Sequence, residues 1–586
     1  MLGRYAQPMM AKERDGGLTL DDAAPDFSRY PTYDQLTAML HDWEAAYPHL
    51  LSVESLGTSP EGRDLWSATV TDTTVGSPDD KPALYIDGNI HAGEVLPSVI
   101  CLYTIWDLIS RFSQDQEVTD LLHTRTFYIR PRVAPDGAER YLTSPDRLRS
   151  AARLWPREQP APGLHAADVD GDGHILQMRI LDPAGEWRVS DLDDRLMVRR
   201  GLDDEAGTRY RLLPEGTVHG PLNGDLQPAA PRWGLDFNRS FPHNWQPEYR
   251  QGGAGPYPLF PLETRATADF FLAHPNIGAA VAYHTFGGFV FHLPSSTPAS
   301  TYNHDDLPGP YQELTDAFTH MTGRPGFQSY DEATDTARSG SFMDWAYSQR
   351  GVYTWVPELW DVADAAGVHR DPEDLVGPLD EAGEAALLRW NDEHLGGQGF
   401  VDWRPFDHPQ FGSVEIGGWT YKFTHQNCPG SYIPALARPH VDWTYLLARA
   451  LPQLAIERTT VTNLGGELWA LEVQAVNEGY LPTNGSQQAI DVGLADSVTV
   501  TVEGAGVETV DGEPSRNLGH LEGYGGKADP PWRGPVPARR SAMARLVLRV
   551  PAATDKLRVR VASSKAGAVS RIVDLTTDAD DDAGLS

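Results

Sequence analysis

The chain has 586 residues, of which 82 are acidic and 48 basic, so its formal net charge is −34. A surface this acidic repels phosphate backbones and anionic lipid, which argues against nucleic acid and membranes as partners. The length, together with 40% hydrophobic residues, predicts two or more domains with large cores. Only two cysteines are present, Cys101 and Cys428, and these are too few for a disulfide framework.

Residues 1–30 are expected to form an N-terminal extension. Residues 1–26 mix charged and small residues without the apolar core of a secretory signal, and no run of about twenty apolar residues occurs in the chain. These features predict a soluble, cytoplasmic protein. Secretion stays open, because a start site chosen downstream of a true signal would give the same appearance.

Residues 31–455 alternate between strand-like and helix-like segments, which predicts an α/β domain with a mixed central sheet covered by helices. Such open sheets place their ligands at the ends of the strands. Apolar, β-branched runs predict strands at 65–71, 83–90, 125–131, 278–284 and 352–357. Amphipathic segments predict helices at 95–112, 261–273, 310–322, 379–394 and 437–455.

Two regions depart from this alternation. Residues 138–233 form a long polar excursion, which is expected to be an insertion that lines or shades the mouth of the site. Over residues 456–586, short alternating runs separated by Gly, Pro, Asn and Asp predict a C-terminal antiparallel β-sandwich domain. No catalytic constellation is visible there, so a packing role is favoured over carbohydrate or protein binding.

A histidine and a glutamate three positions apart, His91 and Glu94, follow the strand-like run 85–89. An imidazole nitrogen and a carboxylate oxygen at this spacing can converge on one ion, and Zn²⁺ accepts such ligands while leaving a position open to water. A third ligand must come from elsewhere, and His284, at the end of the strand-like run 279–283, is the best candidate. An isolated H-x-x-E pattern more often satisfies a turn, so its partners decide the matter.

The sequence carries further motifs in a fixed order between residue 33 and about residue 455, and together they resemble the zinc carboxypeptidases of the carboxypeptidase A type, which remove C-terminal amino acids. The motifs are Tyr33-Asp34-Gln35-Leu36, Gly62-Arg63, His91 to Glu94, Pro135-Asp136-Gly137, Asp236-Phe237-Asn238-Arg239-Ser240-Phe241-Pro242, Glu263-Thr264-Arg265, His284 and Pro357-Glu358-Leu359. The resemblance implies one zinc ion held by His91, Glu94 and His284.

The resemblance also implies two catalytic residues. Glu358 follows an apolar strand, where loss of water could raise the pKa of a carboxyl group into the range of a general base. A carboxylate at a strand end is ordinarily a surface group, and the Pro357-Glu358-Leu359 context reverses that expectation. Arg149 is expected to stabilise the negative oxygen of the tetrahedral intermediate, with Arg153 and Arg157 as alternatives that spacing cannot exclude.

The resemblance also implies that Asn238 and Arg239 recognise a terminal carboxylate, and a planar guanidinium suits this role because it can bind a carboxylate with two hydrogen bonds. Asp236 corresponds to an acid that orients a zinc-bound imidazole, here that of His91. The structural alternative is that Asp-x-Asn-Arg only forms a hydrogen-bonded turn. Both readings can hold together, because a well-defined turn would position the guanidinium.

The chain departs from the family at the substrate side. Gly93 replaces an arginine found two residues after the first histidine in animal digestive members, and Phe286 replaces a tyrosine. Tyr330 is the candidate for the mobile tyrosine that contacts substrate, although it lies several residues too far from the following motif. Met343 or Phe342 occupies the position that sets side-chain preference, which favours an apolar pocket.

An aspartate-rich stretch at 168–173 resembles the start of a calcium-binding loop, with Asp168, Asp170 and Asp172 as candidate ligands. Position twelve of such a loop is Arg179, which excludes a complete EF-hand, while Asp182 or Glu186 could close a variant loop. Calcium binding and a plain acidic turn are equally compatible with this pattern.

The expected function is therefore zinc-dependent removal of C-terminal residues, with apolar ones preferred, from peptides that have a free C-terminus. A zinc-dependent deacylase or a peptidase acting on peptidoglycan stems would need the same metal and base. An inactive binding module is disfavoured, because it has no need of both histidines, Glu94 and Glu358. The sequence does not indicate an oligomeric state.

Overall fold

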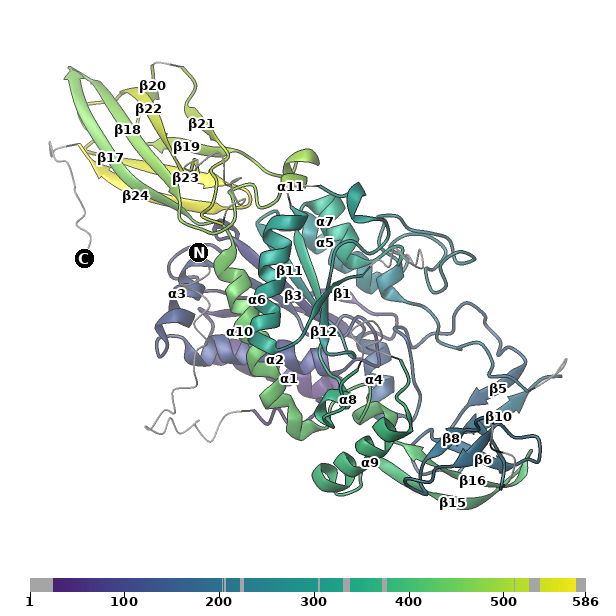
Figure 1. Ribbon diagram of the computed structural model, residues 1–586. Coiled ribbons are helices and arrows are strands. Elements are labelled where there is room, and N and C mark those ends of the chain that lie inside the picture. The colour runs from purple at the N-terminus through teal and green to yellow at the C-terminus, as the bar shows by residue number, and fades with distance from the viewer. Residues whose placement is uncertain are drawn as a thin grey trace, which may run out of the picture.

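The computed structural model describes residues 25–202, 204, 207–221, 226–303, 306–329, 338–370, 377–510, 512–525 and 538–575. An α/β domain lies at the centre, with a lobe of short strands at one end and a β-sandwich at the other (Figure 1). Most of the expected N-terminal extension, residues 1–24, lies outside the described ranges. None of the described helices is long and apolar enough to cross a membrane.

The central sheet is mixed, as predicted, and its eight strands lie in the order β1-β2-β4-β3-β11-β14-β12-β13. Strands β4, β3, β11 and β14 run parallel, whereas β1, β2 and β12 pair in antiparallel fashion. The strands are β1 (Leu51–Thr58), β2 (Asp64–Val70), β3 (Ala83–Gly88), β4 (Thr126–Arg130), β11 (Ile277–Tyr283), β12 (Phe289–His292), β13 (Gly326–Gln328) and β14 (Tyr353–Glu358). Strands β3, β4 and β11 are buried along their whole length because helices cover both faces of the sheet.

Two tyrosines on neighbouring strands show which helices cover which face. Tyr85 on β3 packs against Phe271 of α5 and Phe342 of α7. Tyr283 on β11 pairs with Gly88, three positions after Tyr85 and so on the opposite face, and its hydroxyl lies 2.6 Å from that of Thr444 in α10. The helices are α1 (Tyr33–Ala46), α2 (Leu96–Arg111), α3 (Gln116–Thr124), α4 (Pro135–Thr143), α5 (Leu262–Ala273), α6 (Gln312–Thr322), α7 (Phe342–Arg350), α8 (Val362–Ala365), α9 (Glu381–Leu395), α10 (Ile433–Ala450) and α11 (Gln487–Asp491).

The end of helix α10 differs from the prediction. The helix was expected to reach residue 455, but it ends at Ala450. Pro452 follows two residues later and disfavours helical backbone at Leu451, the residue before it. Strand β17 of the sandwich then begins at Leu454.

The lobe combines two stretches of sequence that lie far apart. Its six-stranded sheet has the order β15-β16-β6-β9-β7-β8, and β16 pairs with β6 through Glu415 and Arg179. The first residues of the expected insertion, up to Thr143, belong instead to α4, and the hairpin of β15 and β16 was not anticipated as part of the lobe. The strands are β5 (Gly163–Ala166), β6 (Gln177–Leu181), β7 (Trp187–Val189), β8 (Met197–Arg199), β9 (Tyr210–Pro214), β10 (Gly216–His219), β15 (Phe400–His408) and β16 (Gly412–Trp419).

The C-terminal sandwich has two antiparallel four-stranded sheets, in the orders β17-β18-β22-β20 and β21-β19-β23-β24. Alternate residues of β23, such as Leu557, Val559 and Val561, point into its core. The strands are β17 (Leu454–Gly465), β18 (Leu468–Asn477), β19 (Val498–Glu503), β20 (Glu508–Thr509), β21 (Ser515–Gly519), β22 (Ser541–Arg549), β23 (Lys556–Ser563) and β24 (Gly567–Asp574).

A buried lysine joins the sandwich to the α/β domain. Lys565, in the turn between β23 and β24, is 3% exposed, and its Nζ donates a hydrogen bond of 2.7 Å to the carbonyl of Ile277 at the start of β11. Burial, and then the charge of Arg350, lower the pKa of Lys565 to about 7. The unfolded chain therefore binds more protons than the folded protein between this pKa and the ordinary lysine value.

Replacing Lys565 with Met should test this junction. Below pH 7 the folded wild-type protein must bury a charged ammonium, and this cost disappears as the pH rises and the lysine loses its proton. The stability of the variant relative to wild type should therefore increase as the pH falls. Between pH 9 and pH 6 we expect the difference in unfolding free energy, variant minus wild type, to rise by about 1–3 kcal/mol. Chemical denaturation at both pH values measures it. The control Lys556→Met, at an exposed lysine of β23, should show no such change, and equal behaviour of the two variants would contradict the assignment.

Candidate metal centre

Three parallel strands deliver the central residues of the site to one edge of the sheet. Strand β3 ends shortly before His91, β11 ends immediately before His284, and Glu358 is the last residue of β14. The amide of His284 donates to the carbonyl of Pro357 at 2.8 Å, and the amide of Leu359 donates to the carbonyl of His284 at 2.9 Å. The backbone ladder thus sets Glu358 directly beside His284.

The turn after β3 is shaped by two residues that precede His91. Gly88 has no room for a side chain, because a Cβ atom there would lie 2.8 Å from the backbone of Pro97. Asn89 takes a left-handed conformation, with φ of 63°, which asparagine tolerates better than most residues. Its buried amide donates to the carbonyls of His91 at 2.7 Å and Glu94 at 2.9 Å. The turn is therefore held from within before any metal binds.

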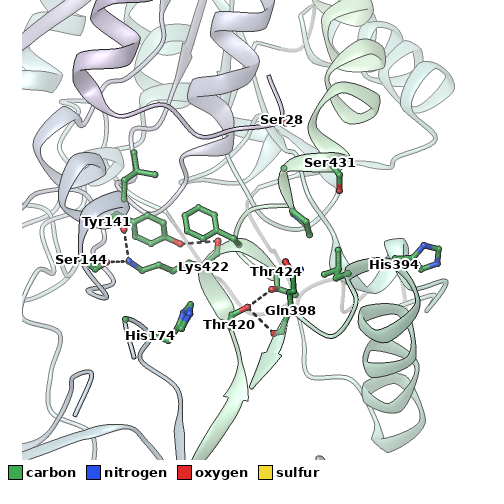
Figure 2. Close-up of a pocket in the computed structure, with 17 residues that line it drawn as sticks. Ser28, Tyr141, Ser144, His174, His394, Gln398, Thr420, Lys422, Thr424 and Ser431 are labelled. Carbon is green, nitrogen blue, oxygen red and sulfur yellow. Dashed lines mark hydrogen bonds between the residues drawn. The ribbon is translucent and has the colours of Figure 1, made fainter. Parts of the chain in front are cut away.

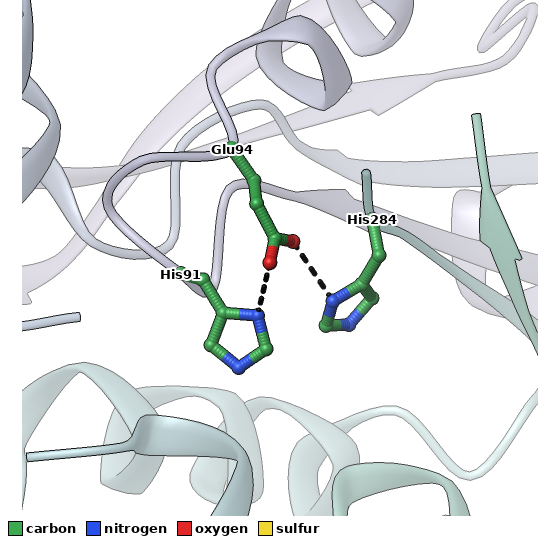
Figure 3. A group of neighbouring side chains, drawn as sticks. All are labelled: His91, Glu94 and His284. Carbon is green, nitrogen blue, oxygen red and sulfur yellow. Dashed lines mark hydrogen bonds and ion pairs between the residues drawn. The ribbon is translucent and has the colours of Figure 1, made fainter. Parts of the chain in front are cut away.

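Glu94 lies between the two histidines (Figure 3). Its Oε1 is 2.7 Å from Nδ1 of His91, and its Oε2 is 2.9 Å from Nδ1 of His284. Each of the three residues offers one ligand atom, and these three atoms all lie within 4.8 Å of one another. All three residues are buried. Two imidazole nitrogens and a carboxylate form a donor set that suits Zn²⁺ and leaves a coordination position for water. The residues therefore fit the expected metal.

The far side of the His91 ring is fixed by Asp236. Nε2 of His91 donates to Oδ1 of Asp236 at 3.2 Å, so Nδ1, on the side of the ring that faces Glu94, is the nitrogen that would bind a metal ion after losing its proton. Burial opposes ionisation of Asp236, but the charges of Arg149 and Arg239 hold its pKa well below the usual range. Burial likewise opposes ionisation of Glu94, yet the two histidines hold its pKa below the usual range.

Arg149 is the arginine that the fold brings to this group. Its Nε donates to Oδ2 of Asp236 at 2.7 Å, its Nη1 lies 3.7 Å from Oε1 of Glu94, and its side chain remains 42% exposed. Arg153 instead stacks on the ring of Phe260, and no metal-group contact is found for the exposed Arg157. Of the three alternatives, Arg149 therefore combines proximity to the metal group with access to solvent.

Asn238 and Arg239 lie in a short 3₁₀ turn, Phe237–Arg239, and the side chain of its N-cap residue, Asp236, accepts the amide of Asn238. Oδ1 of Asn238 accepts the amide of Phe342 at 2.8 Å, which ties this turn to the start of α7. Nη1 of Arg239 donates to the carbonyl of Asn238 at 2.6 Å. The turn and the guanidinium are both present, so the structural and functional interpretations of this motif are compatible.

Glu358 lies near the metal group without a hydrogen bond to it. Burial, and then the negative charge of Glu94, raise the pKa of Glu358 well above its usual range, while Arg149 and Arg338 oppose this shift. The charge of Arg338 also helps burial to lower the pKa of Arg239. No sequence motif had indicated Arg338. A carboxyl group with a raised pKa is suited to accepting and returning a proton.

The residues expected to set substrate preference are less clearly placed. Phe342 is 1% exposed and Met343 is 3% exposed, and both belong to the hydrophobic core around α7. Tyr330 lies outside the described residues. Phe286 lies 6.4 Å, between ring centroids, from Tyr421, a residue that no sequence motif had indicated.

A polar cleft of about 640 Å³ lies next to Tyr421, between the end of α4, the aspartate-rich loop, the end of α9 and the segment 420–431. Figure 2 shows Lys422 reaching across it, where Nζ donates at 2.6 Å to the carbonyls of both Tyr141 and Ser144. Burial lowers the pKa of Lys422 to about 7. The segment that follows β16 is therefore anchored to α4, close to the metal group.

The aspartate-rich loop is held by protein groups. Asp168 accepts the amides of Gly171 and Gly173, and Arg404 of β15 contacts both Asp170 and Asp172. The expected closing residues point elsewhere, since Asp182 pairs with Arg211 and Glu186 with Arg199.

A different acid, Glu215, completes the loop. It is fully buried and accepts the amides of Val169 at 2.6 Å and Leu176 at 2.8 Å. Oxygens of Asp168, Asp170 and Glu215 lie within 4.8 Å of one another. Backbone amides and an arginine already satisfy these carboxylates, so the structure does not support a calcium site.

Parts of the chain are similar to known proteins. A family model described as zinc carboxypeptidase matches residues 36–368, and one described as a domain of unknown function matches residues 453–574. Carboxypeptidase B of Astacus astacus is 35% identical over 345 residues, which are 57% of this chain and 88% of that protein. Carboxypeptidase A2 of Rattus norvegicus is 22% identical, over 58% of this chain and 64% of that protein. A crystal structure of carboxypeptidase A from Helicoverpa armigera has 16% identity and a TM-score of 0.37, over 64% of this chain and 74% of that one.

The metal assignment predicts about one tightly bound zinc ion per chain. His284→Ala should weaken zinc binding by at least about a hundredfold, because each ligand of a protein zinc site carries several kcal/mol of binding free energy. Competition with a chromogenic chelator measures the dissociation constant. The control His394→Ala, at an exposed histidine lining the cleft, should bind zinc like wild type, and tight zinc binding by His284→Ala would place the metal elsewhere.

Proposed function

The chain belongs to the zinc carboxypeptidase family, and we propose that it removes the last residue from peptides that end in a free carboxylate. Zinc metallocarboxypeptidase activity follows from the family. The proposal about the substrate is carried by one observation. The turn that carries Asn238 and Arg239 is joined through Asp236 to the same buried network as the metal group.

His91, Glu94 and His284 would hold the zinc ion, which would act as a Lewis acid in this proposal. Zinc held by Nδ1 of His91, Nδ1 of His284 and the carboxylate of Glu94 would polarise the scissile carbonyl and lower the pKa of a water molecule. Asp236 keeps the proton of His91 on Nε2, so that Nδ1 stays available.

Glu358 is proposed to move the proton. Its carboxylate accepts a proton from the attacking water and passes it to the nitrogen of the departing amino acid, which must leave as an amine. The raised pKa of Glu358 supports the second half of this task, because a protonated carboxyl group is then accessible near neutral pH. Its backbone pairing beside His284 keeps the group next to the reacting bond.

Arg149 is proposed to stabilise the oxygen of the scissile carbonyl, which becomes negative when water attacks. The guanidinium has the access this requires, because its side chain is 42% exposed although Nε is bound to Asp236. The bond to Asp236 also limits the orientations open to the guanidinium. Arg149 would therefore donate from a fixed position, with little reorganisation during the reaction.

Arg239 is proposed to bind the terminal carboxylate of the substrate, with Asn238 beside it. A guanidinium presents paired N–H groups that match a carboxylate, and this arrangement is selective for a free C-terminus. The substrate would then lie with its last peptide bond between Glu358 and Arg149.

Preference for apolar terminal residues is a further proposal. It rests on Met343 and Phe342, which begin α7 beside the Asn238 motif. Both side chains pack into the core. The proposal therefore rests on the absence of a charged side chain at these two positions, where such a group would favour a charged terminal residue.

Glu358→Gln tests the proton transfer. The amide is nearly the same size as the carboxylate but cannot accept the proton, so kcat should fall by at least about a hundredfold while zinc stays bound. Steady-state kinetics on a short peptide, with zinc content measured on the same sample, distinguish the two effects. Unchanged turnover would mean that the base lies elsewhere.

Arg239 and the substrate carboxylate can be tested together. Arg239→Ala should lower kcat/KM for a free-acid peptide, because a charge-assisted pair of hydrogen bonds is lost. The loss should correspond to about 2–4 kcal/mol of transition-state stabilisation. Amidation of the C-terminus removes the same contact from the other side, so wild type should discriminate strongly between acid and amide while the variant discriminates little. Arg239→Lys should not restore activity, since an ammonium lacks the planar paired donors.

The same measurements separate the alternative functions. If wild type cleaves free and amidated peptides at similar rates, the terminal carboxylate is not recognised, and the chain acts as an endopeptidase or a deacylase. Acylated amino acids and peptides assayed side by side would identify which bond is cut.

A further inference from the structure

One buried side chain from a distant part of the chain contacts the backbone on both sides of Glu94. Asn427 is fully buried. Its Oδ1 accepts the amide of Leu96 at 2.9 Å, and its Nδ2 donates to the carbonyl of Gly93 at 2.8 Å. Leu96 begins α2, whose N-cap residue, Val95, makes no side-chain cap. Asn427 therefore satisfies an open amide of this helix end and holds the residue before the metal ligand.

The neighbouring residue, Gln426, contacts both ligand-bearing loops. Its carbonyl accepts a hydrogen bond of 2.8 Å from Oγ1 of Thr285, the residue after His284. Its side chain packs against Gly93, where an added Cβ atom would lie 2.7 Å from Nε2 of Gln426. The dipeptide Gln426–Asn427 thus connects the loop of His91 and Glu94 with the loop of His284.

The segment 421–427, which we call the clasp, is held in several places. Within it, the amide of Asn427 donates to the carbonyl of Lys422 at 3.1 Å, and Nδ2 of Asn427 donates to the same carbonyl at 2.9 Å. Nε1 of Trp360, two residues after Glu358, donates to the carbonyl of Thr424 at 2.8 Å. The clasp consequently touches the segments that carry both histidines, Glu94 and Glu358.

The clasp lies outside the part of the chain that matches the family model, which ends at residue 368. It connects β16 of the lobe with α10 of the central domain. The side chains of Asn427 and Gln426 are amides that already have partners, namely backbone groups for Asn427 and the hydroxyl of Tyr141 for Gln426, so neither is offered as a metal ligand. Its contribution must therefore act through the position of the ligands.

We propose that Asn427 is a positioning residue for the metal centre, and that the clasp keeps the two ligand-bearing loops at the separation that zinc binding needs. This inference rests on the zinc site of the proposed function but not on any substrate. Partners outside the ligand set that orient metal ligands commonly change metal affinity about 10- to 100-fold when they are lost. When the loops are already fixed, metal binding loses less conformational entropy, and the affinity for zinc is higher.

Asn427→Leu tests this, because leucine has a similar size and no charge but makes no hydrogen bonds. The matched control is Asn477→Leu in the sandwich. Asn477 is also fully buried, and its amide accepts the backbone amides of Gln453 and Gly479 and donates to the carbonyls of Leu481 and Glu522. The two substitutions remove the same kind of interaction at different distances from the metal.

The measurement is the dissociation constant of Zn²⁺, by competition with a chromogenic chelator, together with thermal unfolding of the metal-free protein. We expect Asn427→Leu to weaken zinc binding about 10- to 100-fold and Asn477→Leu to leave it unchanged, although both lower the unfolding temperature. Zinc affinity of Asn427→Leu equal to that of the control would overturn the proposal.

Thr285→Val gives a second, milder test if Asn427→Leu does not fold. Valine keeps the shape of threonine but removes the bond to the carbonyl of Gln426, so zinc affinity should fall several-fold, as expected for loss of an outer contact. Wild-type affinity in this variant would count against the clasp. Because zinc binding is measured without peptide, a wild-type protein that binds zinc but cleaves no peptide would overturn the proposed function and leave this inference standing.

Discussion

The structure depends on a single buried carboxylate, that of Glu94, shared between two imidazole rings. An isolated carboxylate at 4% exposure would cost several kcal/mol in lost hydration. Here its oxygens lie 2.7 Å and 2.9 Å from nitrogens of His91 and His284. A metal ion at this position would complete the compensation. The arrangement is stable only if both histidines arrive at the same point, and the sheet provides for this.

Parallel strand order explains how residues almost two hundred positions apart meet. Strands β3, β11 and β14 are neighbours in register and end at the same edge, so the turns that follow them converge. Asp236 then links this group to Arg149 and the Asn238–Arg239 turn. Charges of opposite sign alternate through the network, which lets several ionised groups share a poorly hydrated site.

Segments outside the central sheet contribute to the site without supplying ligands. The lobe is completed by the hairpin of β15 and β16, and the chain that leaves this hairpin forms the clasp beside Glu94. Lys422 and Tyr141 anchor the same segment to α4. Hydrogen bonds from the segment after β16 therefore connect the lobe to the backbone of the metal centre, although the two lie far apart in the sequence.

The sequence by itself indicated most elements of the α/β domain and the candidate residues of the metal group. Strand and helix positions in the α/β domain followed from apolar periodicity, which is a local property, and the residues of the metal group followed from ordered motifs that resemble those of the zinc carboxypeptidases. Only the tertiary structure decided which of three arginines reaches the site, that Arg404 and Glu215 hold the aspartate-rich loop, and that Asn427 supports Glu94 from 331 residues beyond Leu96 in the chain. Those choices depend on packing between distant segments, and a hydrogen bond from an amide to a distant backbone leaves no periodic or compositional signal in the sequence.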